Sequence, residues 1–439
     1  MTSAESPYRI SPMPLFGTSG IRALANTSLL EISLKVGLSL GRRYPRVIVA
    51  SDTRTSSPSI KCALFGGLMA AGALPSDAGI LPTPTLAIAA KHYDCAVMVT
   101  ASHNPPQYNG LKMLNPDGSP FNLEQQLQVE DCIGSTCVPT VSWESFQPLE
   151  YNRTAVQDHI AHIRKRFKSN YPLSVVVDCG GGAASPITPE MLKTLGCRVR
   201  VINGTQTGFF PRPSEPTENN LDGLKRAVVE SNADLGLAHD GDADRVMAVD
   251  DRGRFVSGDT LLSIFAREIG AMKIITTIDT SMAVDDLGIS VIRTGVGDNN
   301  VSEVLKTGGD FGGEPSGAWI FPESSLCPDG IYAAAMLVEI VSHRKLSDFV
   351  DASAKYPIRR GSVKRRINLD GLETTMAAKL EPISIQRIDG VKFNLRDGWV
   401  LIRHSGTEPI TRFTVEAKTA LRMDEIFKQT EILILESTG

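Results

Sequence analysis

The sequence contains no apolar run that approaches the roughly 20 residues of a membrane-spanning helix. Its first residues, MTSAESPYRI, also lack the basic stretch and following apolar run that are typical of a signal peptide. We therefore expect no membrane partner and a cytoplasmic location.

An excess of basic residues is missing as well, since the formal net charge is −4. Proteins that bind nucleic acids carry a basic surface that neutralises phosphates, so no nucleic-acid partner is expected. A small anion can still bind at a local cluster of positive side chains.

Paired cysteine motifs are also absent. The seven cysteines are scattered without Cys-x-x-Cys spacing, which favours reduced thiols over a disulfide framework or a zinc site. Cys132 and Cys137 are close enough in sequence to pair, although two thiols in a loop are the preferred interpretation.

The sequence does contain a degenerate repeat. A chain of 439 residues, 42% hydrophobic and 21% charged, is typical of a soluble protein with several cores. Three apolar runs each end at an aspartate and lead into small residues and a helical pattern: RVIVASDTR (46–54), LSVVVDCGGGAA (173–184) and KIITTIDTSMA (273–283). Strand, turn and crossover helix in this order predict parallel α/β sheets.

A second buried strand in each unit ends in a polar loop, at 94–105, 233–245 and 309–319. Ligands of open α/β sheets bind beyond the carboxyl ends of strands, so each unit is expected to offer one functional loop. The C-terminal part mixes strands, turns and helices in an α+β pattern. The expected domains are 1–145, 146–252 and 253–357, each an α/β/α unit with a mixed sheet, and the α+β unit 358–439.

The loop HDGDADRV (239–246) places Asp240, Asp242 and Asp244 at alternating positions. Three carboxylates this close repel one another unless a cation neutralises them, and oxygen ligands favour Mg²⁺ or Ca²⁺. An EF-hand loop is excluded because Arg245 stands where that loop needs glycine, while a solvated acidic turn is the simpler alternative. Arg245 directly follows Asp244, which indicates that an anion binds beside the metal ion.

The segment RHSGTEPITR combines hydroxyls, a glycine and two guanidinium groups in one turn between strands. Its candidate residues are Arg403, Ser405, Gly406, Thr407 and Arg412. Such groups are suited to a phosphate dianion. A plain hairpin turn explains the Ser-Gly pair but not the arginines.

Two further segments are candidates for ligand contacts. GGEPSGAW offers Glu314 and Ser316, which can bind sugar hydroxyls, although it is also an ordinary turn. FGTSGIRA adds Arg22 as a candidate anion contact. His159 and His162 lie three apart on a helical pattern without a third ligand, and we expect both at the surface.

Ser102 follows an apolar strand in VMVTASHNPP. A serine hydrolase is not indicated, because the G-x-S-x-G elbow is missing. Neighbouring residues of an extended chain point to opposite sides, so His103 is expected to be badly placed as a base for Ser102. The metal and phosphate loops instead indicate phosphoryl chemistry, in which a serine carries a phosphate.

Together these motifs resemble those of the α-D-phosphohexomutases, which include phosphoglucomutase, phosphomannomutase and phosphoglucosamine mutase. TASHNP resembles the family's phosphoserine loop, DGDADR its magnesium loop, GEPSG its sugar loop, RHSGTEP its phosphate loop and FGTSGIR its N-terminal motif. The motifs occur in the family order. The resemblance implies a four-domain, heart-shaped fold around a central cleft, in which the first three domains share a topology.

The resemblance also implies roles for individual residues. Ser102 would be the phosphorylated serine, and with Asp240, Asp242 and Asp244 it would hold Mg²⁺. Lys112 would be a general acid/base, which requires a lowered pKa if it acts as a base. The remaining roles are placed around the reacting phosphate (Arg22, His103, Arg245), at the sugar hydroxyls (Glu314, Ser316) and at the other phosphate (Arg403, Ser405, Gly406, Thr407, Arg412).

The implied activity is the interconversion of hexose 1-phosphate and 6-phosphate through phosphoserine and a 1,6-bisphosphate, which is also the activator. The partner would be a small phosphosugar, and the protein a monomer or homodimer. TGVGDNNV (294–301) is similar to the segment of phosphoglucosamine mutases and favours glucosamine phosphate over mannose and glucose phosphates. Ser19, Ala23, Ala318 and His404 depart from commoner family residues.

Two alternatives of other classes remain open from the sequence. One is a catalytically silent relative that binds sugar phosphates as a regulator, although such a protein has no need of an intact Ser102, Lys112 and acidic loop. The other is a Mg²⁺-dependent phosphatase, in which water takes the phosphate from Ser102.

Overall fold

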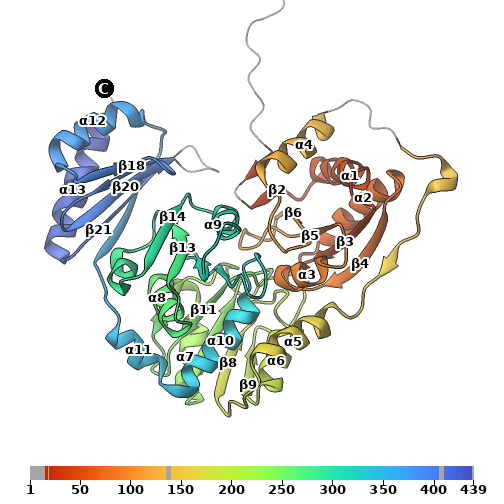
Figure 1. Ribbon diagram of the computed structural model, residues 1–439, viewed down its shortest axis with the longest axis horizontal. Helices are drawn as coiled ribbons and strands as arrows, with labels where there is room; N and C mark the ends of the chain where they lie inside the picture. The colour runs from red at the N-terminus through yellow and green to blue at the C-terminus, as the bar shows by residue number, and fades with distance from the viewer. Residues whose placement is uncertain (1–14, 18, 135–139, 405–409, 438–439) are drawn as a thin grey trace, which may run out of the picture.

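The computed structural model describes residues 15–17, 19–134, 140–404 and 410–437. Figure 1 shows units arranged as an open V, with the first unit (red to orange) and the last (blue) forming its two arms. Within the described residues, no helix combines the length and the hydropathy that crossing a membrane requires.

The first unit is built around a seven-stranded sheet in the order β1-β2-β6-β5-β3-β4-β7. Its elements are β1 (Phe16–Gly17), β2 (Gly20–Leu24), α1 (Thr27–Gly41), β3 (Arg46–Ser51), α2 (Ser57–Ala70), β4 (Leu74–Ile80), α3 (Thr83–Ala90), β5 (Cys95–Val99), β6 (Tyr108–Leu114), α4 (Leu123–Gly134), the 3-10 turn η1 (Trp143–Ser145) and β7 (Glu150–Tyr151).

The second unit has a five-stranded sheet in the order β12-β11-β10-β8-β9. Its elements are α5 (Ala155–Arg166), β8 (Ser174–Asp178), α6 (Thr188–Thr194), β9 (Arg198–Ile202), η2 (Glu218–Asn220), α7 (Asp222–Glu230), β10 (Leu235–His239), β11 (Val246–Val249) and β12 (Phe255–Val256).

The third unit has a four-stranded sheet in the order β14-β13-β15-β16. Its elements are α8 (Gly258–Glu268), β13 (Lys273–Thr277), η3 (Met282–Leu287), β14 (Ser290–Thr294), α9 (Asp298–Leu305), β15 (Phe311–Gly313), β16 (Trp319–Ile320), α10 (Gly330–His343) and α11 (Leu346–Ala352).

The fourth unit is an antiparallel five-stranded sheet in the order β17-β21-β20-β19-β18, packed with two helices. Its elements are β17 (Ile358–Val363), α12 (Leu369–Leu380), β18 (Ser384–Gln386), β19 (Val391–Asn394), β20 (Gly398–His404), β21 (Thr411–Ala417) and α13 (Ala420–Glu436). The predicted C-terminal α+β unit is confirmed, and its first strand begins at Ile358.

The first three sheets share a common arrangement of four strands. β3, β8 and β13 each lie between two parallel neighbours, and the chain then adds an antiparallel strand beside β5, β10 and β15. The predicted threefold repeat is therefore confirmed. Two short edge strands extend these sheets: β7 pairs with β4, and β12 pairs with β11.

The central strands are buried on both faces, as expected where helices cover a mostly parallel sheet. Residues 47–50 of β3 and 95–99 of β5 have no exposed surface. Their polar continuations leave the sheet at its carboxyl edge, which brings the loops after β5, β10 and β15 to the interior of the V (Figure 1).

His159 is buried, so the prediction that it lies at the surface is wrong. Its ring lies between the Thr85 hydroxyl and the Asp329 carboxylate, each 3.0 Å away. Asp329 also caps α10, accepting the Tyr332 N–H at 2.8 Å. His159 on α5 thus connects the second unit to the first and the third. The helical periodicity of α5 cannot predict these contacts, because Thr85 and Asp329 lie in distant segments of the chain.

Candidate active site

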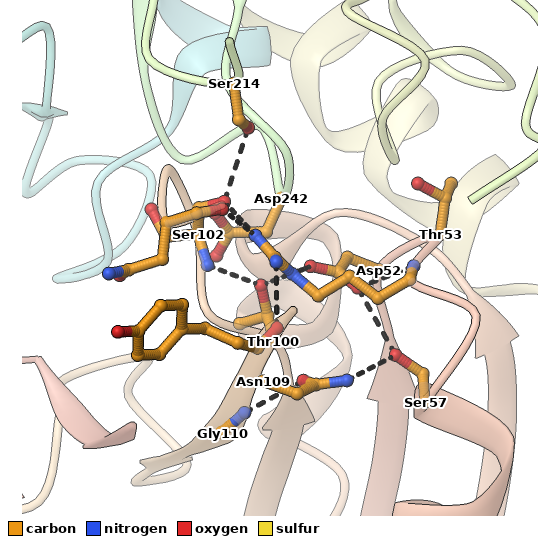
Figure 2. A network of polar contacts seen from close by, with 12 residues as sticks. Asp52, Thr53, Ser57, Thr100, Ser102, Asn109, Gly110, Ser214 and Asp242 are labelled. Carbon is orange, nitrogen blue, oxygen red and sulfur yellow. Dashed lines mark hydrogen bonds and ion pairs between the residues drawn. The ribbon is translucent and has the colours of Figure 1, made fainter. Parts of the chain in front are cut away.

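Ser102 lies in the loop that follows β5 and has an unusual backbone conformation. Its φ of 50° is in the left-handed region, where residues with a side chain are strained by about 1–3 kcal/mol. Its N–H donates to the Thr100 hydroxyl at 2.8 Å, which in turn donates to Asp52 at 2.6 Å (Figure 2). The side chains around the loop therefore hold Ser102 in a conformation that the isolated chain disfavours.

A buried arginine, Arg54, organises the same loop. It is 2% exposed, and all five of its N–H donors are used. They reach the Asp52 carboxylate at 2.9 Å and the carbonyls of Ser102, Asn104, Pro105 and Tyr108 at 2.7–2.9 Å. The sequence motifs do not identify Arg54 as a site residue. The only local indication of its role is its position two residues after Asp52, at the end of a predicted strand.

The loop after β10 brings the three predicted carboxylates together. Asp240, Asp242 and Asp244 are all buried, and each offers an oxygen within 4.8 Å of the others. Ala243 has a φ of 56°, which turns the chain tightly enough for this convergence. The predicted cluster is thus present, and a solvated acidic turn is excluded by its burial.

These carboxylates fit a divalent cation. The Oδ1 atoms of Asp242 and Asp244 are buried and have no hydrogen-bond partner among the described residues. Unpaired buried carboxylate oxygens are costly unless a cation takes them up. An oxygen-only set of this kind suits Mg²⁺ or Ca²⁺.

Ser102 reaches directly into this cluster. Its Oγ donates to Asp240 Oδ2 at 2.8 Å, across the boundary between the first and second units. Ser214 of the second unit adds a hydrogen bond of 3.3 Å to the Ser102 carbonyl, as Figure 2 shows. The serine and the acidic loop therefore form one site.

Lys112, on β6, donates to Asp242 at 2.8 Å and to Asp244 at 2.5 Å. Burial lowers the pKa of Lys112, but the attraction of these carboxylates is larger and the net pKa is raised. Burial likewise raises the pKa of Asp240, and the negative charges of Asp244 and Asp242 raise it further. Lys112 is therefore an ammonium ion that partly neutralises the cluster.

His103 lies closer to Ser102 than an extended chain allows. Its Nδ1 is 3.4 Å from Ser102 Oγ, so the expectation that the two side chains point apart is wrong. The reason is the left-handed φ of Ser102. The positive charge of Arg245, then burial and Arg22, lower the pKa of His103 to about 2, which leaves the ring neutral and a weak base.

The two arginines predicted near the reacting phosphate lie at the same place. Arg22 donates to the Asn104 side chain at 3.0 Å, and burial followed by the charge of Arg245 lowers its pKa. Burial disfavours the charged form of Arg245. The negative charges of Asp244 and Asp240 together have the larger effect, and they raise the pKa of Arg245. The arginines thus add positive charge beside Ser102.

The segments FGTSGIR and TGVGDNNV meet across the site. The Ser19 hydroxyl donates to Asp298 Oδ1 at 2.7 Å. An aspartate at position 19, which is commoner in the family, would bring two carboxylates together. Ser19 thus joins the first unit to the start of α9 in the third unit.

The β15–β16 turn places Glu314 and Ser316 at the rim of the cavity described below. Glu314 is 6% exposed and accepts the Gly297 N–H at 2.8 Å. Burial first, and then the charge of Asp298, raise its pKa to about 7. A carboxyl group near half-protonation can both donate to and accept from sugar hydroxyls.

A cavity of about 700 Å³ extends from this turn to the fourth unit. Arg403 on β20 and Arg412 on β21 both line it, and the two residues face each other in the strand register. Arg403 also pairs with Asp389 at 3.3 Å. The predicted phosphate residues Ser405, Gly406 and Thr407 lie outside the described residues.

A serine beside a cation-binding cluster, together with a cavity lined by arginines, is suited to phosphoryl groups. Models of the phosphoglucomutase/phosphomannomutase domains match the chain in order: α/β/α domain I at 13–136, domain II at 151–253, domain III at 257–356 and the C-terminal domain at 362–432. The chain therefore belongs to the phosphoglucomutase/phosphomannomutase family, and the resemblance found in the sequence is confirmed.

Individual proteins to which the chain is similar indicate which members of this family it resembles. The chain is 47% identical to a probable phosphoglucosamine mutase of Methanosarcina acetivorans, over 97% of this chain and 100% of the relative. It is 38% identical to the phosphoglucosamine mutase of Methanocaldococcus jannaschii, over 96% and 98%. A crystal structure of a phosphoglucomutase/phosphomannomutase family protein from Burkholderia thailandensis superposes with a TM-score of 0.86 at 26% identity, covering 97% and 98% of the two chains.

Proposed function

We propose that this protein is a phosphohexomutase that interconverts glucosamine 6-phosphate and glucosamine 1-phosphate. The observation that carries the proposal is Ser102, whose Oγ lies 2.8 Å from Asp240 within a buried carboxylate cluster. Two relatives that match over nearly the full chain, at 47% and 38% identity, are named probable phosphoglucosamine mutase and phosphoglucosamine mutase, and these names support the choice of sugar. The proposed location is the cytoplasm.

In the proposed reaction Ser102 carries a phosphoryl group. The bond between phosphorus and Ser102 Oγ breaks while a bond forms to the free hydroxyl of a hexose monophosphate. The proton that this hydroxyl loses balances the proton that Ser102 Oγ gains. The resulting 1,6-bisphosphate turns end for end and returns its other phosphoryl group to Ser102. Because this step phosphorylates the serine, added hexose 1,6-bisphosphate would activate the unphosphorylated protein.

Asp240, Asp242 and Asp244, together with Ser102, are the residues that would hold Mg²⁺. When bound there, the ion supplies positive charge that stabilises the phosphoryl group during transfer. The unpaired Oδ1 atoms of Asp242 and Asp244 support this assignment.

The cationic residues position the reacting phosphate. Arg22 and Arg245 supply fixed positive charge, and His103 is a neutral hydrogen-bonding group beside Ser102 Oγ. The carboxylates of Asp242 and Asp244 raise the pKa of Lys112 and favour its ammonium form, and in the proposal Lys112 is the general acid/base of the transfer.

The cavity has room for the bisphosphate to turn. Its volume of about 700 Å³ lies within the range of pockets that enclose small ligands. In the proposal Glu314 and Ser316 bind sugar hydroxyls while Arg403 and Arg412 bind the phosphate that is not transferred. Ser405, Gly406 and Thr407 are assigned to the same phosphate on their sequence motif.

A coupled assay tests the proposal. Purified protein is mixed with Mg²⁺, a trace of glucose 1,6-bisphosphate and glucosamine 6-phosphate, and formation of the 1-phosphate is followed. We expect isomerisation that falls by about 10³-fold or more in Ser102→Ala, since the phosphoryl carrier is lost. The exposed Ser142→Ala is the matched control.

Each contrary result identifies an alternative. Release of inorganic phosphate without an isomer would identify a phosphatase, and binding without turnover a silent regulator. Turnover of only mannose or glucose phosphates would reject glucosamine phosphate as the substrate. Wild-type turnover by Ser102→Ala would reject the serine as the carrier.

A further inference from the structure

The cavity next to the sugar loop is lined by groups of opposite charge. Its arginines all come from the sheet of the fourth unit and are Arg360, Arg403 and Arg412. Its carboxylates come from the second and third units and are Glu215, Asp279 and Glu314. A ligand bound in the cavity therefore has both positive and negative side chains around it.

Two of the three carboxylates have charged or peptide partners. Glu215 pairs with Arg245 at 3.5 Å. Glu314 accepts the Gly297 N–H at 2.8 Å, and its pKa near 7 makes it only partly charged at neutral pH. Glu215 is therefore already paired with a cation, and Glu314 is only partly ionised. Neither residue offers a ligand a full, unpaired negative charge.

Asp279 differs from both. It follows the carboxyl end of β13 and is half-buried, and its Oδ1 accepts the Thr277 hydroxyl at 2.6 Å. A hydroxyl donor is neutral, and no ion pair joins Asp279 to another described residue. Lys392 is close enough for Asp279 to raise its pKa, but its Nζ donates to the Ile278 carbonyl at 2.7 Å and not to Asp279.

We propose that the Asp279 carboxylate binds the protonated amino group at C2 of the sugar and so selects amino-sugar phosphates over glucose and mannose phosphates. This inference rests on the proposed function and names a specificity-determining residue for it. Glucosamine phosphate is a zwitterion, and the cavity lining offers arginines for its phosphate and a carboxylate for its ammonium group. A hydroxyl at C2 would meet Asp279 without charge assistance and bind more weakly.

The test compares Asp279→Asn with the wild type on glucosamine 6-phosphate and on glucose 6-phosphate. Asparagine has the same shape and keeps an acceptor for Thr277, so the fold is retained. We expect kcat/KM for glucosamine 6-phosphate to fall by about 10- to 100-fold, while kcat/KM for glucose 6-phosphate is unchanged or rises. Asp286→Asn, an exposed change in the same unit, is the control.

A second variant and a pH series guard against a purely structural effect. Asp279→Glu keeps the charge and should recover part of the preference for the amino sugar. In the wild type that preference should decline as rising pH deprotonates the substrate amine, and in Asp279→Asn it should vary much less with pH.

The outcomes separate this inference from the proposed function. If the wild type does not isomerise glucosamine phosphate, the proposed function fails, and Asp279 fails with it. If the wild type does so but Asp279→Asn lowers kcat/KM equally for both sugars, or for neither, only the role of Asp279 is overturned.

Discussion

Glu416 should hold the fourth unit against the third. It is fully buried on β21 and accepts hydrogen bonds from Trp399 Nε1 at 2.6 Å, from the Met282 N–H at 2.8 Å and from the Ser281 hydroxyl. Ser281 and Met282 belong to the third unit, so one carboxylate joins the two units. We predict that Glu416→Ala loosens this junction.

The expected size follows from the donors that lose their acceptor. The Ser281 hydroxyl can rotate, but the N–H groups of Trp399 and Met282 cannot, and each buried unsatisfied donor costs about 1–3 kcal/mol. The free energy needed to open the junction between the third and fourth units should therefore fall by about 2–6 kcal/mol. In Glu416→Gln the remaining carbonyl oxygen can still accept the N–H groups of Met282 and Trp399, and the new amide can donate to the Ser281 hydroxyl, so the effect should be smaller.

Hydrogen–deuterium exchange measures this opening. Amides of β19 and β20 and of residues 276–283 should exchange about 30-fold faster or more in Glu416→Ala, since about 1.4 kcal/mol corresponds to tenfold. KM for the phosphosugar should rise because the arginines of the fourth unit lose their position. The exposed Glu431→Ala on α13 is the control. Exchange in Glu416→Ala that matches this control would show that Glu416 does not hold the two units together.

Three further perturbations follow from the buried charges. Arg54→Ala should lower the free energy of unfolding by about 3–5 kcal/mol, because it leaves Asp52 buried without its cation; a thermal melt like that of the wild type would contradict this. Added Mg²⁺ should raise the melting temperature in a saturable way, and Asp242→Asn should weaken that titration, so an unchanged curve would argue against the metal site. Burial lowers the pKa of Lys392 to about 7 from 10.5, so the unfolded chain binds more protons between these values and stability should rise with pH through this window. Urea midpoints at about pH 6 and about pH 9 should show that rise in the wild type and lose it in Lys392→Met.

The repeated strand–turn–helix pattern and the functional loops are accessible from sequence because their determinants are local. Asp240, Asp242 and Asp244 lie within five residues of one another, so their alternation predicts a carboxylate cluster before any fold is known. The change of architecture near residue 358 is likewise visible in the local pattern of apolar and polar residues.

The surroundings of Ser102 are less accessible. Arg54 is 48 residues from Ser102 and binds its carbonyl, and Asp240 is 138 residues away and accepts its hydroxyl hydrogen bond. The close approach of His103 depends on a single left-handed φ that strand periodicity does not predict. Burial and charge then set the pKa of His103 and of Lys112, and neither quantity belongs to a short segment.

The class of sheet, the repeat, the acidic loop and the candidate serine can be predicted from the sequence, because they depend on the periodicity and spacing of neighbouring residues. The raised pKa of Lys112, the burial of His159 and the cavity that Asp279 shares with Arg360 cannot be predicted in this way. Such features depend on contacts between units far apart in the chain, where burial and the sum of nearby charges set the chemistry.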